Sequence, residues 1–399
     1  MAEAGRAGHP RLLVLGAGPA QLGLLEGARA RDVYVIAADR DPAAPGLRFA
    51  DERAIVSTED EPAIERLARA REVAGIVSPG ADWPVGVAAR VAERLGLPHP
   101  LDAATAAVVT SKARQRERFT AAGVPQPRSL GPDADTFPSV VKAVDRQGQR
   151  GLTLVEQAED LGPAVARAVD ESRSGGWVVE ELVEGPEVTV NAFSADGAFM
   201  PLTVTDRLTA EPPAFGVALA HAWPCEHDSV IAAEAARAAA AAAGVREGPT
   251  YTQVRLGPDG PRVIELAARL GGGHDAELCE AALGVDLNWL AIEAAFGVRP
   301  PGSDPLGLTP SAVAGGACVV FLVAPPGILR EVEGLEEAAA LPGIRWVRSY
   351  RPPGWQFGPL RRGADRAGAV LAVGNDRDDA LARARRAAAT VRFVVDAEV

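Results

Sequence analysis

The sequence predicts an α/β protein with two or three domains. Its 399 residues are enough for that number of separate cores. Near the start, an apolar segment at 11–16, a glycine-rich turn with a helix, and a second apolar segment at 33–38 form a βαβ pattern. Later, the segments 252–257 and 260–266 flank a Pro-Asp-Gly turn, which is typical of an antiparallel hairpin. We therefore expect parallel and antiparallel sheet in one chain, an α/β fold with α+β parts.

Composition and charge restrict the kinds of function. The net charge of −12 argues against nucleic acid as a partner, because phosphate backbones attract basic patches. The three cysteines are far apart and odd in number, which favours reduced thiols. The first ten residues lack an apolar signal core, and no uncharged apolar run of about 18 residues follows. We expect a cytoplasmic protein with no membrane partner.

The first glycine-rich turn has two interpretations. Gly16, Gly18 and Gly23 follow the first strand, and Asp39 ends the second, which suggests a dinucleotide site with Asp39 on a ribose. The fingerprint is imperfect, because Gln21 occupies the usual place of the third glycine. The other interpretation is a tight turn that lets helix and strand pack closely. An NAD(P)-dependent oxidoreductase is therefore kept as an alternative.

The only two lysines both lie at points suited to phosphate binding. Lys112 is in the first turn of a helix expected from 111 to 122, where a cation opposes the helix dipole unless an anion is bound. Lys142 lies in a short strand at 138–143, before the turn Gly148-Gln-Arg-Gly151. Backbone N–H groups of such a turn can close over phosphates while a lysine neutralises their charge. Solvated surface lysines and a plain hairpin are the alternatives.

An acidic segment follows at 177–191. It is interpreted as a hairpin, with two strands around the turn Gly185-Pro186. Glu180 and Glu181 interrupt an apolar strand and Glu187 follows the turn, although a charge in a half-buried strand is costly unless paired or solvated. Edge exposure is one explanation. A nucleotide hinge is the other, with backbone groups near Glu180 and Val183 at the adenine and Glu187 on the ribose.

The 252–266 hairpin predicts a metal site. If Asp259 is the turn centre, it lies midway between Gln253 and Glu265, so these two side chains fall opposite each other on one face. Two oxygen ligands suit Mg²⁺, which usually takes only a few protein ligands. A bulge would change this register, and an ordinary cross-strand polar pair is the alternative.

In this order, the motifs resemble the ATP-grasp superfamily, in particular its carboxylate–amine ligases of the L-amino-acid-ligase type. The resemblance rests on the two lysines, the glycine turn, the acidic hinge and the run Glu265-Leu-Ala-Ala-Arg269-Leu-Gly-Gly. It implies a fold related to biotin carboxylase, carbamoyl-phosphate synthase and D-Ala-D-Ala ligase. It also implies a disordered tail at 1–10, a Rossmann-like pre-ATP-grasp domain at 11–110, an ATP-grasp domain at 111–310 with a mobile lid at about 138–182, and a C-terminal α+β domain at 311–399.

The resemblance assigns roles to particular residues. Lys142 and Arg269 are expected to be catalytic, with Arg269 on the substrate carboxylate and on the transferring phosphoryl group. The metal, Mg²⁺ or Mn²⁺, is expected on Gln253 and Glu265. ATP is expected to contact Lys112, Lys142, Gly148, Arg150, Gly151, Glu180, Glu181, Val183 and Glu187. The second-substrate pocket is expected to include Arg269, Gly272, His274 and His221, with loops at 206–215 and 221–227.

The resemblance implies an ATP-dependent carboxylate–amine ligase that forms an amide through an acyl phosphate and releases ADP and phosphate. Its partners would be a small-molecule carboxylate and an amine, and a homodimer is left open. Two departures matter: many relatives have Asn where this chain has Ala267, and many have an acid at Gln253. A catalytically weak ATP-binding relative is therefore a second alternative. His221, Cys225 and His227 lack a fourth ligand at zinc-site spacing.

Overall fold

A computed structural model describes residues 9–298 and 312–396. The chain begins with a parallel four-stranded sheet in the order β3-β2-β1-β4. The predicted βαβ unit is confirmed at 11–39. The elements of this part are β1 (Arg11–Leu15), α1 (Leu22–Ala30), β2 (Tyr34–Asp39), β3 (Glu52–Ile55), α2 (Glu61–Ala70), β4 (Gly75–Val77), α3 (Asp82–Leu95) and the 3₁₀ helices Pro19–Gln21 and Pro45–Phe49. Most of the tail expected at 1–10, and a Pro/Gly-rich linker expected at 300–310, lie outside the described residues.

Close packing accounts for the N-terminal glycines. A Cβ on Gly23 would lie 2.5 Å from the Glu277 carboxyl carbon, so glycine lets α1 approach helix α8 (Asp275–Leu283). The Asp39 carboxylate accepts a hydrogen bond of 2.8 Å from the Ala17 amide, inside the same turn. Asp39 therefore stabilises the turn itself, and the packing interpretation explains the pattern without a dinucleotide.

Two helices lead from this sheet into the next part. They are α4 (Ala103–Val109) and α5 (Lys112–Ala122). The Ser111 hydroxyl caps α5 by accepting from the Arg114 amide, and Gly123 ends it in the left-handed conformation. Lys112 is thus the first residue of the helix, as predicted.

A small separate sheet follows, with the order β6-β5-β7. Its strands are β5 (Ser139–Ala143), β6 (Leu152–Val155) and β7 (Trp177–Glu181), and helix α6 (Leu161–Glu171) packs on it after the 3₁₀ helix Ala158–Asp160. Val141, Val155, Ala168 and Val179 belong to an apolar cluster of its own. We call residues 139–181 the 139–181 module.

The predicted hairpin at 177–191 is wrong. β7 pairs with β5 in the small module, whereas β8 (Glu187–Ala195) pairs with β9 and β11 of the central sheet. The Gly185-Pro186 turn is therefore a crossover between two sheets. A Cβ on Gly185 would lie 2.2 Å from the Leu256 carbonyl oxygen, so glycine permits the close approach of this crossover to β11.

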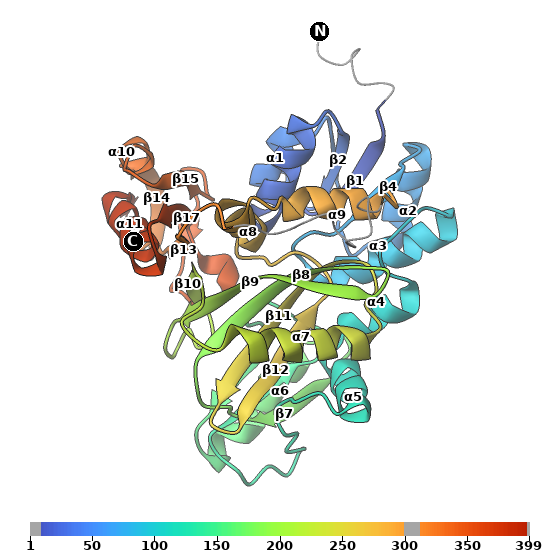
Figure 1. Ribbon diagram of the computed structural model, residues 1–399, viewed down its shortest axis with the longest axis vertical. Helices are drawn as coiled ribbons and strands as arrows, with labels where there is room; N and C mark the ends of the chain where they lie inside the picture. Colours follow the sequence, from blue (N-terminus) through green and yellow to red (C-terminus); the bar gives the residue numbers. More distant parts are fainter. Residues whose placement is uncertain (1–8, 299–311, 397–399) are drawn as a thin grey trace.

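The central sheet has eight strands in the order β12-β11-β8-β9-β10-β13-β17-β15. The C-terminal strands extend it, because β13 pairs with β10. Helix α7 covers one face, and α8 and α9 lie between the sheet and the N-terminal part (Figure 1). Its elements are β9 (Ala198–Thr209), β10 (Ala218–Trp223), α7 (Ser229–Ala243), β11 (Gly248–Gly257), β12 (Gly260–Ala267), α9 (Leu287–Ala295), β13 (Gly316–Leu322), β15 (Ile344–Ser349) and β17 (Gly368–Gly374).

A fourth sheet, β16-β14-β18, lies at the C-terminal end, where Figure 1 shows it beside α10 and α11. These elements are β14 (Gly327–Glu333), α10 (Leu335–Ala339), β16 (Gln356–Phe357), the 3₁₀ helix Gly363–Asp365, α11 (Arg377–Thr390) and β18 (Arg392–Asp396). The sequence pattern predicts strands near 317–323, 344–350 and 369–373 and a helix from 377 to about 389, which correspond to β13, β15, β17 and α11. It does not predict β14, β16 or β18.

The β11–β12 hairpin brings Gln253 opposite Glu265, as predicted. The reason for this pairing differs from the predicted one, which placed the turn centre at Asp259. The turn closes on the pair Gly257 and Gly260, and a bulge next to Gln253 shifts the register by one residue. The predicted turn centre at Asp259 gave the right pair because the bulge compensates for the displaced turn.

Candidate active site

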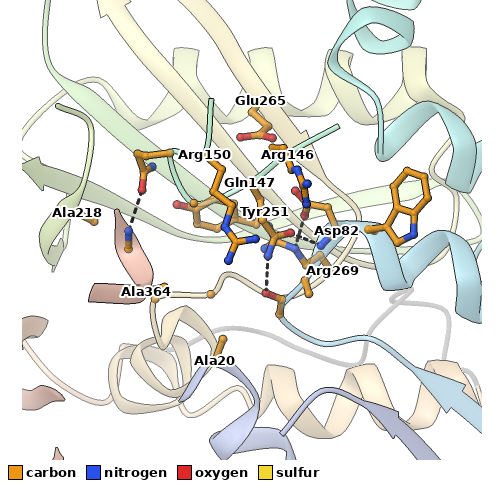
Figure 2. A pocket seen from close by; sticks show the side chains of 18 of the residues that line it. Ala20, Asp82, Arg146, Gln147, Arg150, Ala218, Tyr251, Glu265, Arg269 and Ala364 are labelled. Carbon is orange, nitrogen blue, oxygen red and sulfur yellow. Dashed lines mark hydrogen bonds and ion pairs between the residues drawn. The ribbon is translucent and has the colours of Figure 1, made fainter. Parts of the chain in front are cut away.

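A cleft of about 440 Å³ opens where the 139–181 module faces the other parts of the chain. Figure 2 shows side chains from separate segments pointing into it, among them Asp82, Arg150, Glu265 and Arg269. Of the residues predicted for the site, the cleft is lined by Lys112, Lys142, Gly148, Arg150, His221, Gln253, Glu265, Arg269 and Gly272. Outside its lining lie Gly151, Glu180, Glu181, Val183, Glu187 and His274.

Lys112 joins helix α5 to the hairpin. Its ammonium lies 2.8 Å from Glu265 Oε1 and donates to the Arg146 carbonyl oxygen at 2.5 Å. The Glu265 carboxylate is thus the anion that offsets the unfavourable position of a cation in the first helical turn. Burial would raise the pKa of Glu265, but Lys112 outweighs it and the pKa lies below its usual range.

Lys142 and Glu180 form a buried ion pair inside the 139–181 module. Lys142 Nζ lies 2.7 Å from Glu180 Oε2, and Arg116 Nε lies 2.5 Å from Glu180 Oε1. Burial would raise the pKa of Glu180, but the two cations lower it to about 2. Burial lowers the pKa of Lys142, against the effect of Glu180. The side chain of Glu180 therefore holds two cations in place below the cleft and does not project into it.

The remaining acids of the hinge have different surroundings. Glu181 lies 3.4 Å from Arg128 at the surface. Glu187 is buried between Arg207, at 2.7 Å, and Arg255, at 3.3 Å. Arg255 also donates to the Val183 carbonyl oxygen at 3.0 Å. Arg207 and Arg255 therefore tie the crossover to strands β9 and β11.

Gln253 and Glu265 face the cleft from adjacent strands and offer an amide and a carboxylate oxygen. Ala267 adds no ligand, and no group of three or more His, Cys, Asp or Glu side chains that could hold a metal occurs within 9–298 and 312–396. Because Mg²⁺ commonly keeps waters and substrate phosphates as ligands, two protein oxygens fit it. The donor set therefore suits a metal shared with phosphate.

Arg269 is fixed at the cleft wall. Its Nε lies 2.6 Å from Asp82 Oδ1, and its Nη1 donates to the Leu270 carbonyl oxygen at 2.6 Å. Burial opposes the charged form, but Asp82 raises the pKa of Arg269 above its usual value. The guanidinium also lies over the Tyr251 ring, 5.8 Å from its centroid. Asp82 comes from α3 of the N-terminal part, so this pair connects two parts of the chain across the cleft.

His221 lies in strand β10, so the predicted pocket loop at 221–227 is wrong for its first three residues. The predicted loop at 206–215 is likewise wrong for its first four residues, because 206–209 lie in β9. His221 Nδ1 lies 2.8 Å from the buried Asp275 Oδ1, and His221 Nε2 has no partner among the described residues. The sequence predicts strands as far as Trp223, and β10 confirms this end point.

His274 has a packing role in this structure. Its ring is buried, with Nε2 at 2.6 Å from the Tyr350 hydroxyl and Nδ1 at 2.9 Å from Glu277. Tyr350 itself lines the cleft. His274 therefore contacts the cleft only through Tyr350.

Sequence reasoning missed several residues of the cleft wall. They come from the start of α3, the tip of the 139–181 module, strand β11 and the C-terminal part, and include Asp82, Gln147, Tyr251, Tyr350, Arg351 and Arg366. The Gln147 side chain accepts from the Asp82 amide and Gln149 accepts from the Gly363 amide at 3.3 Å. No local pattern marks such contacts, because their partners are far apart in sequence.

Family comparisons agree with this arrangement. Residues 135–277 match the model described as ATP-grasp domain, which spans the module, the crossover and the hairpin. Residues 135–277 are therefore an ATP-grasp domain. Residues 320–396 match the model described as L-amino acid ligase C-terminal domain 2.

Two similar proteins and one solved structure align with most of this chain. The uncharacterized protein y4rH of Sinorhizobium fredii is 28% identical over 83% of this chain and 70% of its own length. A formate-dependent phosphoribosylglycinamide formyltransferase of Burkholderia lata is 28% identical over 96% of this chain and 95% of its length. The crystal structure of an L-amino acid ligase from Bacillus licheniformis superposes with a TM-score of 0.83 at 20% identity, covering 98% of this chain and 99% of that one. The structural likeness shows the fold. None of the helices within the described ranges is long and apolar enough to cross a membrane.

Proposed function

We propose that this ATP-grasp protein is an ATP-dependent ligase that joins a small carboxylic acid to an amine, in the manner of an amino acid ligase. One observation carries the proposal. The cleft brings Lys112, Lys142 and Arg269 to the same space as the paired oxygen ligands Gln253 and Glu265. Cations and a metal site around one cleft suit phosphoryl transfer to a carboxylate, which depends on positioning and charge neutralisation.

The proposed reaction has two steps. A carboxylate oxygen of the acid attacks the γ-phosphorus of ATP, the bond to the β,γ-bridging oxygen breaks, and ADP leaves with that electron pair. The amine nitrogen then attacks the acyl carbon of the acyl phosphate, inorganic phosphate departs, and the nitrogen loses a proton. In this proposal Arg269 holds the acid, and Lys112 and Lys142 neutralise phosphate charge. Lys142 would turn from Glu180 towards the phosphates, because its ammonium is bound to Glu180 in this structure.

We assign the metal and the moving part to residues already described. Mg²⁺ or Mn²⁺ would be held by Glu265 and Gln253 and would neutralise charge on the phosphates. The 139–181 module would act as the lid, with Gly148, Arg150 and Gly151 over the nucleotide. Backbone groups near Glu180, Glu181 and Val183 would contact the adenine, and Glu187 the ribose. Gly272 and His221 would border the acid, with His274 behind them. Location in the cytoplasm and a homodimeric state remain proposals.

A second candidate is an ATP-binding protein with weak ligase activity. It is favoured by Ala267, which leaves the metal with only two protein oxygens beside the hairpin. It predicts nucleotide binding without appreciable ADP release.

The experiment is a matrix of carboxylic acids and amines, with amino acids in both roles. ADP release is measured with ATP and Mg²⁺, and products are identified by mass. We expect ADP release that requires both substrates, with formation of an amide. A variant unable to neutralise the phosphates, Lys112→Ala, should lose about 10²-fold in rate. Saturable ATP binding without ADP release for any pair would favour the second candidate.

A further inference from the structure

One wall of the cleft carries positive charge that the proposed reaction does not use. It is formed by Tyr350 and Arg351, which follow strand β15, and by Arg366, which lies just before strand β17. We call these three residues the C-terminal wall. Neither arginine has a carboxylate within ion-pair distance among residues 9–298 and 312–396. Burial lowers the pKa of both guanidinium groups.

Five other cations that line the cleft have carboxylate partners, whereas Arg146 and Arg150 at the module tip form no ion pair among the described residues. Lys112 pairs with Glu265, Arg207 with Glu187 and Arg269 with Asp82, all within 2.8 Å. A few residues away from the C-terminal wall, Arg348 is bound to both Glu26, at 2.5 Å, and Glu277, at 2.9 Å. The chain therefore supplies an acid where an arginine has a structural role. Arg351 and Arg366 are half-buried, and a half-buried cation without a carboxylate partner is destabilising unless a ligand provides the charge.

The two arginines are held in position. Arg366 Nε donates to the Gly363 carbonyl oxygen at 2.8 Å, and its guanidinium stacks 3.7 Å from the Phe321 ring centroid. The Arg351 guanidinium stacks 3.8 Å from the centroid of Trp355. A stacked guanidinium keeps free N–H donors in its plane, which is the geometry that binds carboxylate or phosphate with two hydrogen bonds. Arg366 is thus an ordered guanidinium without a carboxylate partner in the described part of the chain, whereas Asp41 and Asp365 lie near enough to Arg351 to act on its charge without forming an ion pair.

The position separates this wall from the phosphate-binding lysines. Arg366 comes from the segment before β17, and its charge environment includes Tyr350, Tyr251, Asp275 and Arg207, none of which was assigned to the nucleotide phosphates. The neighbouring Gly363 amide donates to Gln149 at the tip of the 139–181 module. A ligand on Arg366 would therefore lie under the module tip, on the substrate side of the cleft.

We propose that Arg366, assisted by Arg351, binds a second anionic group of one substrate, a carboxylate or a phosphate carried in addition to the group that reacts. The inference rests on the proposed ligase function and narrows its substrate class. Acidic or phosphorylated amino acids belong to this class. Neutral amino acids do not.

Direct binding to the full-length protein tests the proposal without requiring turnover. The probes are two matched pairs, L-glutamate with L-glutamine and O-phospho-L-serine with L-serine. They are titrated calorimetrically in the presence of Mg²⁺ and a non-hydrolysable ATP analogue. In the wild-type protein we expect at least one charged member to bind about 10- to 100-fold more tightly than its neutral partner, because a charged hydrogen bond is replaced by a neutral one. The pair that shows the preference distinguishes carboxylate from phosphate.

Variants assign the preference to the arginine. Arg366→Met should reduce the preference to below about 3-fold, and Arg366→Lys should restore part of it. Arg361→Met is the matched control, because Arg361 is an exposed arginine of the same segment outside the cleft lining. It should keep the full preference. If Arg366→Met does not fold, the proposal is tested by the preference of the wild-type protein for the charged probe and by the reduced preference expected in Arg366→Lys.

Three results would overturn the proposal. They are equal binding of charged and neutral members, binding of none of the four probes, and a loss of affinity for the ATP analogue alone in Arg366→Met. The last would assign Arg366 to the nucleotide. Failure of the ligase function looks different: a charged probe binds with the expected preference, yet no acid and amine pair releases ADP. Conversely, equal turnover of neutral and acidic amino acids would support the ligase function and contradict the proposed preference for an anionic substrate.

Discussion

Glu180 and Glu181 are neighbours with opposite roles. Strand geometry points successive side chains to opposite faces, so Glu180 is buried against Lys142 and Arg116 whereas Glu181 meets Arg128 at the surface. The sequence showed that these acids needed an explanation but could not say which one was paired, because both partners of Glu180 lie more than thirty residues away. Substituting each glutamate separately therefore compares a buried ion pair with a surface ion pair.

Glu180→Gln should destabilise the protein at pH 7 by about 3–5 kcal/mol, because it leaves two buried cations without their anion. The pKa of Glu180 is about 2 in the folded protein against an ordinary 4.5. Its stabilising contribution is therefore complete above pH 4.5 and is lost as the pH falls towards 2.

Denaturant unfolding between pH 7 and pH 3 should show a steeper loss of the free energy of unfolding in wild type than in Glu180→Gln. Glu181→Gln is the control and should change stability by less than about 1 kcal/mol. Parallel pH profiles for wild type and Glu180→Gln would contradict the assignment.

Substitutions of Glu265 and of Arg269 should change the kinetics of ADP release in different ways. Glu265→Gln removes a charged oxygen from the proposed metal site but keeps the shape of the hairpin, so ADP release should fall by about 10²-fold or more with the fold intact. Arg269→Lys loses the planar fork, so the KM of the acid should rise as kcat falls. Steady-state ADP release at varied Mg²⁺ and acid concentrations separates the two. Glu234→Gln, an exposed change on α7, should match wild type. Full Mg²⁺-dependent activity in Glu265→Gln would refute the metal role.

At the scale of elements, local pattern predicted most helices and strands but not which strands pair. Capping signals predict helix α5 over 111–122, and an Ala-rich segment predicts helix α7 over about 229–243; both helices are confirmed within a residue. The β7–β8 hairpin was wrong because a Gly-Pro pair between two strands looks the same whether the strands pair or separate. Short strands such as β16 were missed because two residues carry no period.

The 139–181 module should respond to nucleotide as a unit. Its tip holds to the rest of the chain through Gln147 at the Asp82 amide and Gln149 at the Gly363 amide, and Arg173 lies 2.5 Å from Glu59. Because the 139–181 module has its own small core and few contacts with the rest of the chain, we expect it to open locally. Hydrogen exchange at 147–152 should slow when ATP and Mg²⁺ are added, and Gln147→Ala should speed it without nucleotide. Gln157→Ala, an exposed change elsewhere in the module, should not. Unchanged exchange at saturating ATP would argue against a lid.

At the scale of the whole molecule, the cleft exists only because distant segments meet. Arg269 and Asp82 are 187 residues apart, and Gln149 and Gly363 are 214 apart. Motif order located the residues on the central sheet, because relatives share that order. It could not reveal Asp82 or Arg366, whose role comes from how the N-terminal and C-terminal parts pack against the centre. The C-terminal strands continue the central sheet, so their loops are rigidly placed over the cleft.

Arg348 is the residue that best tests this packing. From β15 it reaches Glu26 on α1 and Glu277 on α8, and it stacks 4.2 Å from the centroid of Trp346. Burial would raise the pKa of Glu277, but His274 and Arg348 lower it to about 2, so this acid stays charged at neutral pH. Arg348→Met leaves that buried charge short of a partner and should lower stability by about 3–5 kcal/mol.

The readout is calorimetric Tm together with the KM values for ATP and acid. We expect a Tm lowered by about 5 °C or more in Arg348→Met, with both KM values raised because the N-terminal and C-terminal cleft walls lose a shared contact. Glu26→Gln is the matched control: its carboxylate is the more exposed partner, at 35% against 13% for Glu277, so its loss should cost much less. An Arg348→Met protein with wild-type Tm and KM values would show that the central sheet alone fixes the walls.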